Sequence, residues 1–365
     1  MKILHLANHA QKIGNGIVNV MVDLACLQAR AGHEVAVASS GGNFEPLLQR
    51  YGARHFMLRQ SKHPWRVAEM LLGFRKIASD FSPDIVHAHM MTGALLAKLG
   101  RYRRDYTLIT TIHNEFQRSS NLMRVGDQVV AVSDAVATSM VRRGIPAARM
   151  SVVINGIIGA PRFEDRASND DGGPVLQHPN IVTVSGLYER KGMFDLLNAF
   201  RLVLDRRPDI HLYLVGNGPD RQKLEARARE LGLADRAHFA GYVTDPGPYY
   251  RQADVFVLPS HADSCPLAIL EAREVGCAIV GTRVGGIPEL LDEGAAGIIV
   301  PPHMPEMLAP ALLMLHEDEA LRRSWQARAR ANLAPMSAQR VYDEYQQIYA
   351  ATIARRQAEG LCASA

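Results

Sequence analysis

Short, mostly apolar runs alternate along this chain with longer segments in which apolar residues recur every three or four positions. The first run, Ile3–Leu6, is followed by a glycine-containing loop, an amphipathic segment from Ile17 to about Ala31, and a second run at Glu34–Val37. Apolar runs of this length are typical of strands buried on both faces, and the longer period is that of an amphipathic helix. The pattern therefore predicts an α/β fold with parallel sheets.

The same alternation continues through the chain and is interrupted by one polar segment. Residues 162–174, rich in Asp and Gly, are typical of a linker. A last helix is expected from Ser337 to about Ala354, and residues 355–365 are expected to form a frayed tail. Further strands are expected at 84–89, 107–112, 128–132, 150–154, 180–184, 210–215, 236–241, 255–258 and 278–280. Further helices are expected at 65–81, 193–204 and 267–275.

Length and composition limit the class of protein. A chain of 365 residues is too long for one ordinary core and indicates two domains. Apolar residues make up 47% of it, as in a soluble globular protein, and no run approaches the roughly 20 apolar residues of a membrane helix. The opening MKILHLA predicts a strand and not a signal peptide. The cysteines, which lack metal-like spacing and are expected to be reduced thiols in a cytoplasmic protein, are Cys26, Cys265, Cys277 and Cys362.

Charge is unevenly distributed between the two halves. Residues 1–160 hold 19 basic and 10 acidic residues, whereas the remainder holds 22 basic and 27 acidic ones. A basic first half favours an anionic partner, and without a nucleic-acid module a lipid-linked or phosphorylated acceptor or a membrane surface is expected. The helix at 65–81 is either a packed helix with a solvated face or a peripheral membrane contact. The residues that favour the membrane contact are Lys62, Arg66, Arg75, Lys76, Arg101, Tyr102, Arg103, Arg104 and Tyr106.

The candidate chemistry is concentrated in residues 259–289, PSHADSCPLAILEAREVGCAIVGTRVGGIPE. Asp263 lies in a loop after a predicted strand, and Glu271 lies in the helix that follows. Ligands of open parallel sheets bind beyond the carboxyl ends of the strands. Carboxylates accept hydrogen bonds from hydroxyl groups, and a helix N-terminus favours a phosphate. Two carboxylates and a helix N-terminus in this order suit a nucleotide sugar.

Asp263-x7-Glu271 followed by GTRVGGIPE resembles the E-x7-E signature of retaining glycosyltransferases of family 4, which have the GT-B fold. The resemblance covers nearly the whole chain. It departs from the family at Asp263, where the family has Glu, and at Ser264–Leu267, where it has Gly-Phe-Gly-Leu. The resemblance implies two Rossmann-like doubly wound domains facing across a cleft. The expected domains are an acceptor domain at 1–160 with helix 337–365 packing back on it, a linker at 161–175, and a donor domain at 176–336.

Residues 185–192, SGLYERKG, resemble the family's G-R-L-x-x-x-K-G phosphate loop. Lys191 matches the family's lysine, Gly186 stands where the family has an arginine, and Arg190 is the candidate to supply that guanidinium. Two cations are suited to neutralising a leaving diphosphate. The alternative is a solvent-facing basic pair, although the helix dipole slightly disfavours cations at a helix start.

Glycine and histidine positions in the first half also precede helices or end strands. The loop at Gly14–Gly16 is either a plain turn or, as in the resembled family, a loop that approaches the donor phosphate or acceptor. His113 ends a predicted strand and resembles the family's histidine near the donor sugar, where a neutral imidazole orients hydroxyls. For His87 and His89 the core interpretation is favoured.

The resemblance thus implies a retaining hexosyltransferase that moves a hexose-type sugar from a nucleotide-diphosphate sugar to a lipid-linked or saccharide acceptor. Assembly of cell-surface polysaccharide, lipopolysaccharide or glycolipid is expected, in the cytoplasm or at the inner face of the membrane. No cofactor or metal is expected, because the sequence has no D-x-D run. Candidate catalytic residues are His113, Asp263, Lys191 and Arg190. Candidate donor-binding residues are Gly16, Gly186, Gly216, Gly218, Val243, Ser264, Cys265, Leu267 and Glu271.

Two alternatives remain open from the sequence. One is another nucleotide-sugar enzyme of the same fold, such as an epimerase or a phosphorylase. The other is a non-catalytic scaffold that binds a nucleotide sugar.

Overall fold

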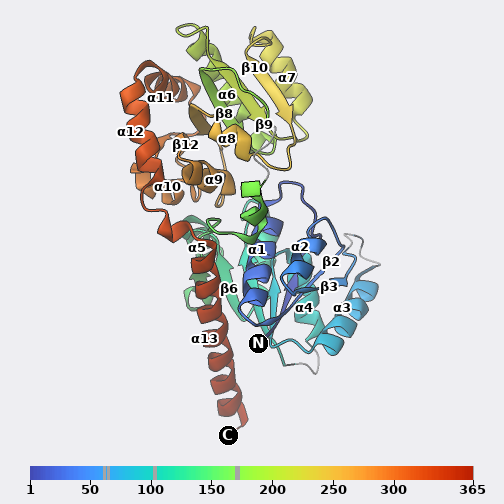
Figure 1. Cartoon of the computed structure of the whole chain (residues 1–365). Helices are drawn as coiled ribbons and strands as arrows, with labels where there is room; N and C mark the ends of the chain where they lie inside the picture. Colours follow the sequence, from blue (N-terminus) through green and yellow to red (C-terminus); the bar gives the residue numbers. More distant parts are fainter. Residues whose placement is uncertain (61–62, 64–65, 102–104, 169–172, 365) are drawn as a thin grey trace. The chain divides into compact units, whose positions relative to one another are not determined.

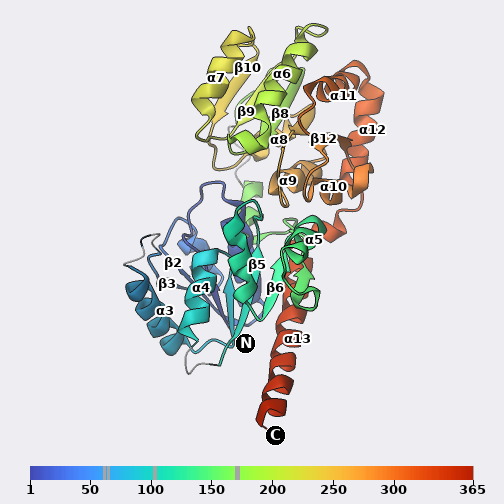
Figure 2. The same cartoon turned by 180° about the vertical axis from the view of Figure 1, so that it is seen from behind.

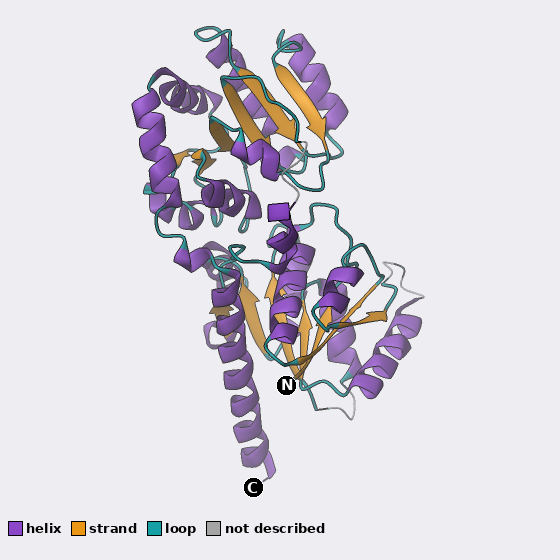
Figure 3. Cartoon of the chain, in the orientation of Figure 1, coloured by secondary structure: helices purple, strands orange, loops and turns teal. Residues whose placement is uncertain are grey.

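The computed structural model describes residues 1–364 apart from 61–62, 64–65, 102–104 and 169–172. The chain divides into two compact units: the first unit is Met1–Asp165 with Met336–Ala365, and the second unit is Arg166–Pro335. Each unit is a parallel sheet with helices on both faces (Figure 3). The α/β class with two doubly wound, Rossmann-like sheets is therefore confirmed.

The sheet of the first unit has the order β3-β2-β1-β4-β5-β6-β7, and every described pairing is parallel. The strand order reverses between β1 and β4, so the loops after these two strands flank the switch point where such sheets bind ligands. Its strands are β1 (Lys2–Leu6), β2 (Glu34–Ser39), β3 (Arg54–Met57), β4 (Ile85–Ala88), β5 (Thr107–Ile112), β6 (Gln128–Ala131) and β7 (Met150–Val152).

The helices of the first unit cover both faces of this sheet. Helix α1 begins where the Asn15 side chain accepts a 3.1 Å hydrogen bond from the Ile17 amide. Helices α3 and α4 cover the face opposite to α1 and α13 (Figures 1 and 2). The helices are α1 (Gly16–Arg30), α2 (Glu45–Arg50), α3 (Val67–Phe81), α4 (Met91–Gly100), α5 (Asp134–Arg142) and α13 (Ala338–Ser364), with 3-10 segments η2 (Arg118–Val125), η3 (Ala147–Arg149) and η4 (Pro161–Ser168), the last of which spans the division between the units.

Helix α13 returns to the first unit and packs beside α1 on the sheet. Tyr345 and Tyr349 are 1% and 0% exposed, and they join the core that contains Ile3, Ile85 and Ile109. The expectation of a frayed tail from residue 355 onward is wrong. Arg355 and Arg356 continue the helix and donate hydrogen bonds of 2.7 and 2.8 Å to the carbonyls of Asp127 and Tyr106. These long donors satisfy carbonyls at the end of the sheet, which apolar periodicity does not reveal.

The sheet of the second unit has the order β10-β9-β8-β11-β12-β13 and is likewise parallel in its described pairings. Its strand order reverses between β8 and β11, so the loops after these strands lie side by side at the switch point. Its strands are β8 (Asn180–Val184), β9 (His211–Val215), β10 (Ala237–Gly241), β11 (Val255–Leu258), β12 (Ala278–Thr282) and β13 (Ile298–Val300).

A largely apolar core joins the sheet of the second unit to α6 and α11. The helices of the unit are α6 (Met193–Leu204), α7 (Arg221–Glu230), α8 (Gly247–Arg251), α9 (Leu267–Val275), α10 (Ile287–Leu290), α11 (Pro305–Glu317) and α12 (Glu319–Arg330). The 3-10 segments are η5 (Glu189–Lys191), η6 (Asp292–Gly294) and η7 (Ala334–Met336), the last of which spans the division between the units.

A buried arginine on α9 is the main polar element in this region of the second unit. Arg273 is 0% exposed and donates to the Leu290 carbonyl at 2.7 Å, and to the Ala329 and Ala331 carbonyls at 3.0 and 2.7 Å. It also pairs with the Asp292 carboxylate at 2.9 Å. One guanidinium therefore ties α9 to the end of α10 and to the end of α12.

Candidate active site

The loops after β8 and β11 bring two of the sequence-predicted residues together. Lys191 Nζ lies 2.5 Å from Asp263 Oδ2, and Ser260 Oγ donates to the same carboxylate oxygen at 3.2 Å. The two charged side chains are 13% and 10% exposed. Since the pair lies at the switch point of the sheet, it is placed where a ligand of this fold binds.

Glycines permit the close backbone approaches that hold this pair. Gly192 has φ +69°, and a Cβ there would lie 1.9 Å from the Pro259 carbonyl oxygen. Gly285 has φ +50°, and its Cβ would lie 1.6 Å from the Asp263 carbonyl oxygen. The next amide, that of Gly286, hydrogen-bonds to the Asp263 carbonyl at 3.3 Å. The glycine pair after β12 thus supports the backbone of the loop that carries Asp263.

Arg190 braces the same loop. Its Nη1 donates to the Ala262 carbonyl at 3.1 Å, and its own carbonyl accepts from the His261 amide at 2.8 Å. Its guanidinium carbon lies 5.9 Å from the centre of the Tyr188 ring. The structure therefore gives Arg190 a supporting contact to the loop that carries Asp263, in addition to any contact with a ligand.

Helix α9 and the residues before it place further candidate donor-binding groups. Glu271 is 8% exposed on α9, and Ser264 is 3% exposed in the preceding loop. Within the described part of the chain, the buried Ser264 Oγ has no hydrogen-bond partner. An unsatisfied buried hydroxyl is costly without a ligand, so it suits contact with a polar group. Cys265 is 8% exposed and Leu267 is half-buried.

The loops after β8, β9 and β10 follow neighbouring strands, and the first two contain glycines. A Cβ at Gly216 would lie 1.9 Å from the Ser185 carbonyl oxygen, and one at Gly218 would lie 2.2 Å from that of Leu187. The Leu187 amide donates to the Asn217 carbonyl at 3.0 Å. Backbone groups consequently form most of this surface. The candidates here are Gly186, Gly216 and Gly218, with half-buried Val243 after β10.

In the first unit, His113 follows β5 and Gly16 begins α1. His113 is partly exposed, and its Nε2 lies 3.2 Å from His89 Nδ1. Burial lowers the pKa of His113 to about 3, so the ring is neutral at physiological pH. A neutral ring of this kind can donate one hydrogen bond to a ligand hydroxyl or accept one from it.

His87 and His89 are core residues, in agreement with the favoured interpretation. They are 0% and 2% exposed, and His87 contacts the Tyr349 and Thr111 hydroxyls at 2.7 Å each. Two further members of this network were not anticipated: His5 on β1, which contacts His89, and Gln28 on α1, which contacts His5. Polar residues on otherwise apolar, buried faces of a strand and a helix are the signal that could have identified them.

The four neighbouring histidines predict an acid-sensitive fold. Burial lowers the pKa of His5 to about 4 and that of His113 to about 3, and lowers those of His87 and His89 well below 6.5. The unfolded chain binds these protons near pH 6.5, so the unfolded state holds more protons and stability falls as pH drops from 6.5 towards 4. The lowered pKa of His5 alone reduces the free energy of unfolding by about 3 kcal/mol between pH 6.5 and 4.

Urea unfolding of the first unit between pH 8.5 and 5 measures this effect. We expect a falling midpoint below pH 6.5 and a plateau above pH 7.5. An unchanged midpoint down to pH 5 would contradict the assignment of neutral, buried rings.

Two groups of side chains in the described residues have the composition of a metal site. His5, His87 and His89 have ligand atoms within 4.8 Å of one another, as do Asp195, His261 and His303. The ring nitrogens of the first group are engaged in hydrogen bonds. In the second group His261 Nε2 lies 2.6 Å from Asp195 Oδ2. This second group, beside the loop after β11, is the better suited of the two to accept a cation.

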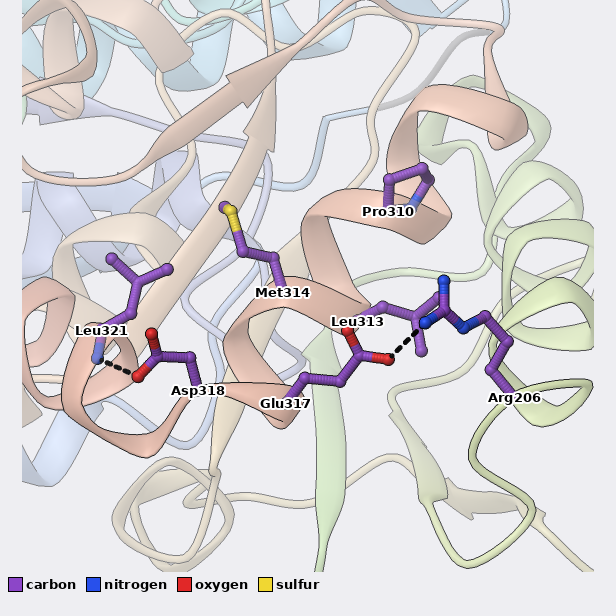
Figure 4. Close-up of a pocket in the computed structure, with 7 residues that line it drawn as sticks. All are labelled: Arg206, Pro310, Leu313, Met314, Glu317, Asp318 and Leu321. Atoms are coloured by element: carbon purple, nitrogen blue, oxygen red, sulfur yellow. Dashed lines mark hydrogen bonds and ion pairs between the residues drawn. The ribbon is translucent and has the colours of Figure 1, made fainter.

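A separate surface hollow of about 360 Å³ lies between the end of α6, α11 and α12 (Figure 4). Glu317 on its rim pairs with Arg206 at 3.2 Å. Helix α6 starts after the carboxyl end of β8, so Arg206, which follows α6, lies at the opposite edge of the sheet from Lys191. The hollow is therefore not part of the candidate site.

Two of the side chains that favoured a membrane contact in the sequence, those of Arg101 and Tyr106, have partners or are buried within the first unit. Arg101 is paired with the Asp127 carboxylate, and Tyr106 is 1% exposed. The expectation that these two side chains contact lipid is wrong, because both are satisfied inside the unit. Lys62, Tyr102, Arg103 and Arg104 lie outside the described residues. None of the helices in the described part of the chain combines the length and the apolar character that a membrane crossing requires.

Family models match most of both units. The model for "Glycosyltransferase Family 4" matches residues 14–158, and that for "Glycosyl transferases group 1" matches residues 178–318. The N-acetyl-alpha-D-glucosaminyl L-malate synthase of Bacillus anthracis is 25% identical over 359 residues, covering 92% of this chain and 93% of that protein. The phosphatidyl-myo-inositol mannosyltransferase of Mycolicibacterium smegmatis is 27% identical, covering 90% and 88%.

Solved structures share the fold. HepE of Anabaena, solved in complex with UDP and glucose, superposes with a TM-score of 0.79 at 20% identity, covering 96% of this chain and 100% of that one. WaaG, a glycosyltransferase involved in lipopolysaccharide biosynthesis, gives a TM-score of 0.72 at 16% identity, covering 93% and 98%. At these identities the likeness establishes the fold.

Proposed function

The chain belongs to the GT-B glycosyltransferases of family 4, and from this premise we propose that it transfers a hexose-type sugar with retention from a nucleotide-diphosphate sugar to an acceptor hydroxyl. The observation that carries the proposal is the Lys191–Asp263 pair at the switch point of the second unit. This pair combines a cation for a diphosphate with a carboxylate for sugar hydroxyls. The solved complexes of HepE with UDP and with UDP-glucose support a donor of this class.

Each candidate residue then has a chemical task. Lys191 neutralises the departing diphosphate, Asp263 accepts hydrogen bonds from the donor sugar, and Glu271 accepts them from the ribose hydroxyls. The glycine loops after β8 and β9, with the loop after β10, receive the nucleotide through backbone amides. Arg190 supports the loop of Asp263, and its guanidinium charge is suited to the diphosphate. His113 orients a hydroxyl of the donor sugar or the acceptor.

Retention is proposed to proceed at the front face of the sugar. The acceptor oxygen forms its bond to the anomeric carbon on the side from which the diphosphate leaves. The departing phosphate oxygen takes the proton of the acceptor hydroxyl, which balances the step without a protein nucleophile. Lys191 stabilises the charge that develops on the leaving group.

The acceptor is proposed to be a saccharide or a lipid-linked saccharide in surface polysaccharide, lipopolysaccharide or glycolipid assembly. The names of relatives support this range, among them a lipopolysaccharide core glycosyltransferase of Rhizobium meliloti that is 30% identical over 201 residues, 54% of this chain and 57% of that protein. The positive charge of residues 1–160 supports an anionic acceptor or an anionic surface.

Nucleotide release from a panel of uridine, guanosine and adenosine diphosphate sugars, with and without saccharide acceptors, tests the proposal. We expect acceptor-dependent release and a product with the anomeric configuration of the donor, read by NMR. An inverted product would refute retention. Release without an acceptor, or only with free phosphate, would favour an epimerase or a phosphorylase, and nucleotide binding without turnover would favour a scaffold.

Transfer is expected to be independent of added metal. This expectation is supported by Lys191 and the loop amides after β8 and β9, which supply a cation and N–H donors for a diphosphate, and by a sequence without a D-x-D run. We therefore expect the initial rate in excess EDTA to stay within about twofold of the untreated rate, whereas removing a required metal would abolish activity. Activity lost to EDTA and restored by manganese would contradict this expectation.

A further inference from the structure

A row of hydrogen-bonded side chains leads from the interior of the first unit to His113. Gln28 Oε1 lies 2.7 Å from His5 Nε2, His5 Nδ1 lies 3.0 Å from His89 Nε2, and His89 Nδ1 lies 3.2 Å from His113 Nε2. The first three members are at most 2% exposed, and His113 is partly exposed. The row therefore connects a ligand-facing ring to the core through three neighbouring contacts.

With Oε1 of the Gln28 amide facing His5, proton counting fixes the direction of every bond in this row. An amide oxygen can only accept, so His5 must carry its proton on Nε2. A neutral imidazole has one N–H, so His5 Nδ1 is bare and accepts from His89 Nε2. By the same rule His89 Nδ1 is bare and accepts from His113 Nε2. His113 is then left with a bare Nδ1.

A second row of contacts accommodates the Gln28 amide in this orientation. Gln28 Nε2 donates to the Tyr349 hydroxyl at 3.3 Å, and that hydroxyl lies 2.7 Å from His87 Nδ1. His87 Nε2 lies 2.7 Å from the Thr111 hydroxyl. With the Tyr349 proton given to His87 Nδ1, His87 donates from Nε2 to Thr111, and each of these buried groups is satisfied. Helix α13 thereby supplies the anchor for an amide on α1.

We propose that Gln28, acting through His5 and His89, sets the tautomer of His113 so that its bare Nδ1 accepts a hydrogen bond from a ligand hydroxyl. The proposal rests on the proposed function. It adds that the ligand group beside His113 must donate a hydrogen bond. A sugar hydroxyl satisfies Nδ1, whereas a carboxylate, a carbonyl or a phosphate oxygen at the same place leaves two acceptors facing each other. Gln28, His5 and His89 are positioning residues, because they act through His113.

Long-range proton–nitrogen spectra of the ¹⁵N-histidine-labelled, ligand-free protein at pH 7.5 test the tautomers directly. Single His→Asn variants assign the signals of His5, His89 and His113. We expect all three rings to carry the proton on Nε2. A His113 ring protonated on Nδ1 would overturn the proposal without affecting the proposed function, because the measurement needs no substrate.

Gln28→Met removes the amide oxygen while keeping the length of the side chain. We expect the His113 signals to change to a mixture of both tautomers and the KM for the donor, or for the acceptor, to rise about tenfold, equivalent to one lost hydrogen bond of about 1.4 kcal/mol. Unchanged His113 signals would refute the role of Gln28.

Gln128→Met is the matched control. Gln128 is also a buried glutamine of the first unit, but its amide donates to Ser151 at 2.9 Å, outside the histidine row. We expect this variant to retain the wild-type tautomers. A shift of the His113 tautomer in Gln128→Met as large as that in Gln28→Met would show a general loosening of the unit and would overturn the proposal.

Discussion

Replacing Lys191 with methionine is expected to lower kcat/KM for sugar transfer by about 100- to 1,000-fold, the usual effect of removing one preorganised group that stabilises charge in the transition state. Methionine keeps most of the side-chain volume and removes the ammonium that lies 2.5 Å from Asp263. The loss is expected mainly in kcat, because charge on the diphosphate increases as the glycosidic bond breaks. Initial rates with the best donor and acceptor of the panel measure it.

Lys223→Met is the control for this experiment. Lys223 also pairs with an aspartate, Asp220 at 3.3 Å, but its side chain is 74% exposed on α7. Exposed ion pairs contribute little, so we expect activity and stability close to wild type. If Lys191→Met retained more than a tenth of the wild-type kcat/KM, another group would have to neutralise the diphosphate, and the assignment of Lys191 would fail.

Replacing Arg273 with methionine is expected to destabilise the second unit by about 3–5 kcal/mol, because the loss of one partner leaves buried acceptors unpaired. Three carbonyls and the Asp292 carboxylate accept from this guanidinium. Arg273→Lys should recover only part of the loss, since an ammonium has three donors and cannot span the four acceptors of a planar fork. A stability unchanged within 1 kcal/mol would contradict the buried network.

Fluorescence of Trp325 can report on this unit alone. Trp325 packs against the core of the second unit, and the other tryptophan, Trp65, can be replaced by phenylalanine in all variants. Urea unfolding followed at this residue gives the free energy. Arg323→Met is the control, because its pair with Glu319 is 74% and 62% exposed and should contribute less than about 0.5 kcal/mol.

The alternation of strands and helices was predictable because burial on both faces leaves a simple apolar pattern. Helix α6 begins and ends at the residues expected from the sequence, and β11 does as well. The close approach of Lys191 and Asp263 was predictable from the sequence for a related reason. The carboxyl ends of adjacent parallel strands meet at one edge, so two loops 72 residues apart in sequence are brought side by side.

The roles of residues that depend on partners far away in the sequence were harder to predict from the sequence. Arg273 reads as a basic residue in the last turn of a helix, a position where the dipole alone justifies it, and its acceptors come from two other helices. Gln28 lies on a helix face whose neighbours are buried, yet its partners are on β1 and α13. The continuation of α13 past residue 354 likewise depends on carbonyls of the sheet. Local periodicity does not contain these partners.

The assignment of α13 to the first unit also affects the order in which the protein can mature on the ribosome. Synthesis is vectorial, and residues 166–335 of the second unit are translated before Tyr345 and Tyr349. The nascent first unit consequently waits with Gln28 and His87 lacking their Tyr349 partner until the second unit has been translated. The first unit therefore cannot complete its core before the second unit has been translated, in contrast to the usual N-terminal-first order of domain folding.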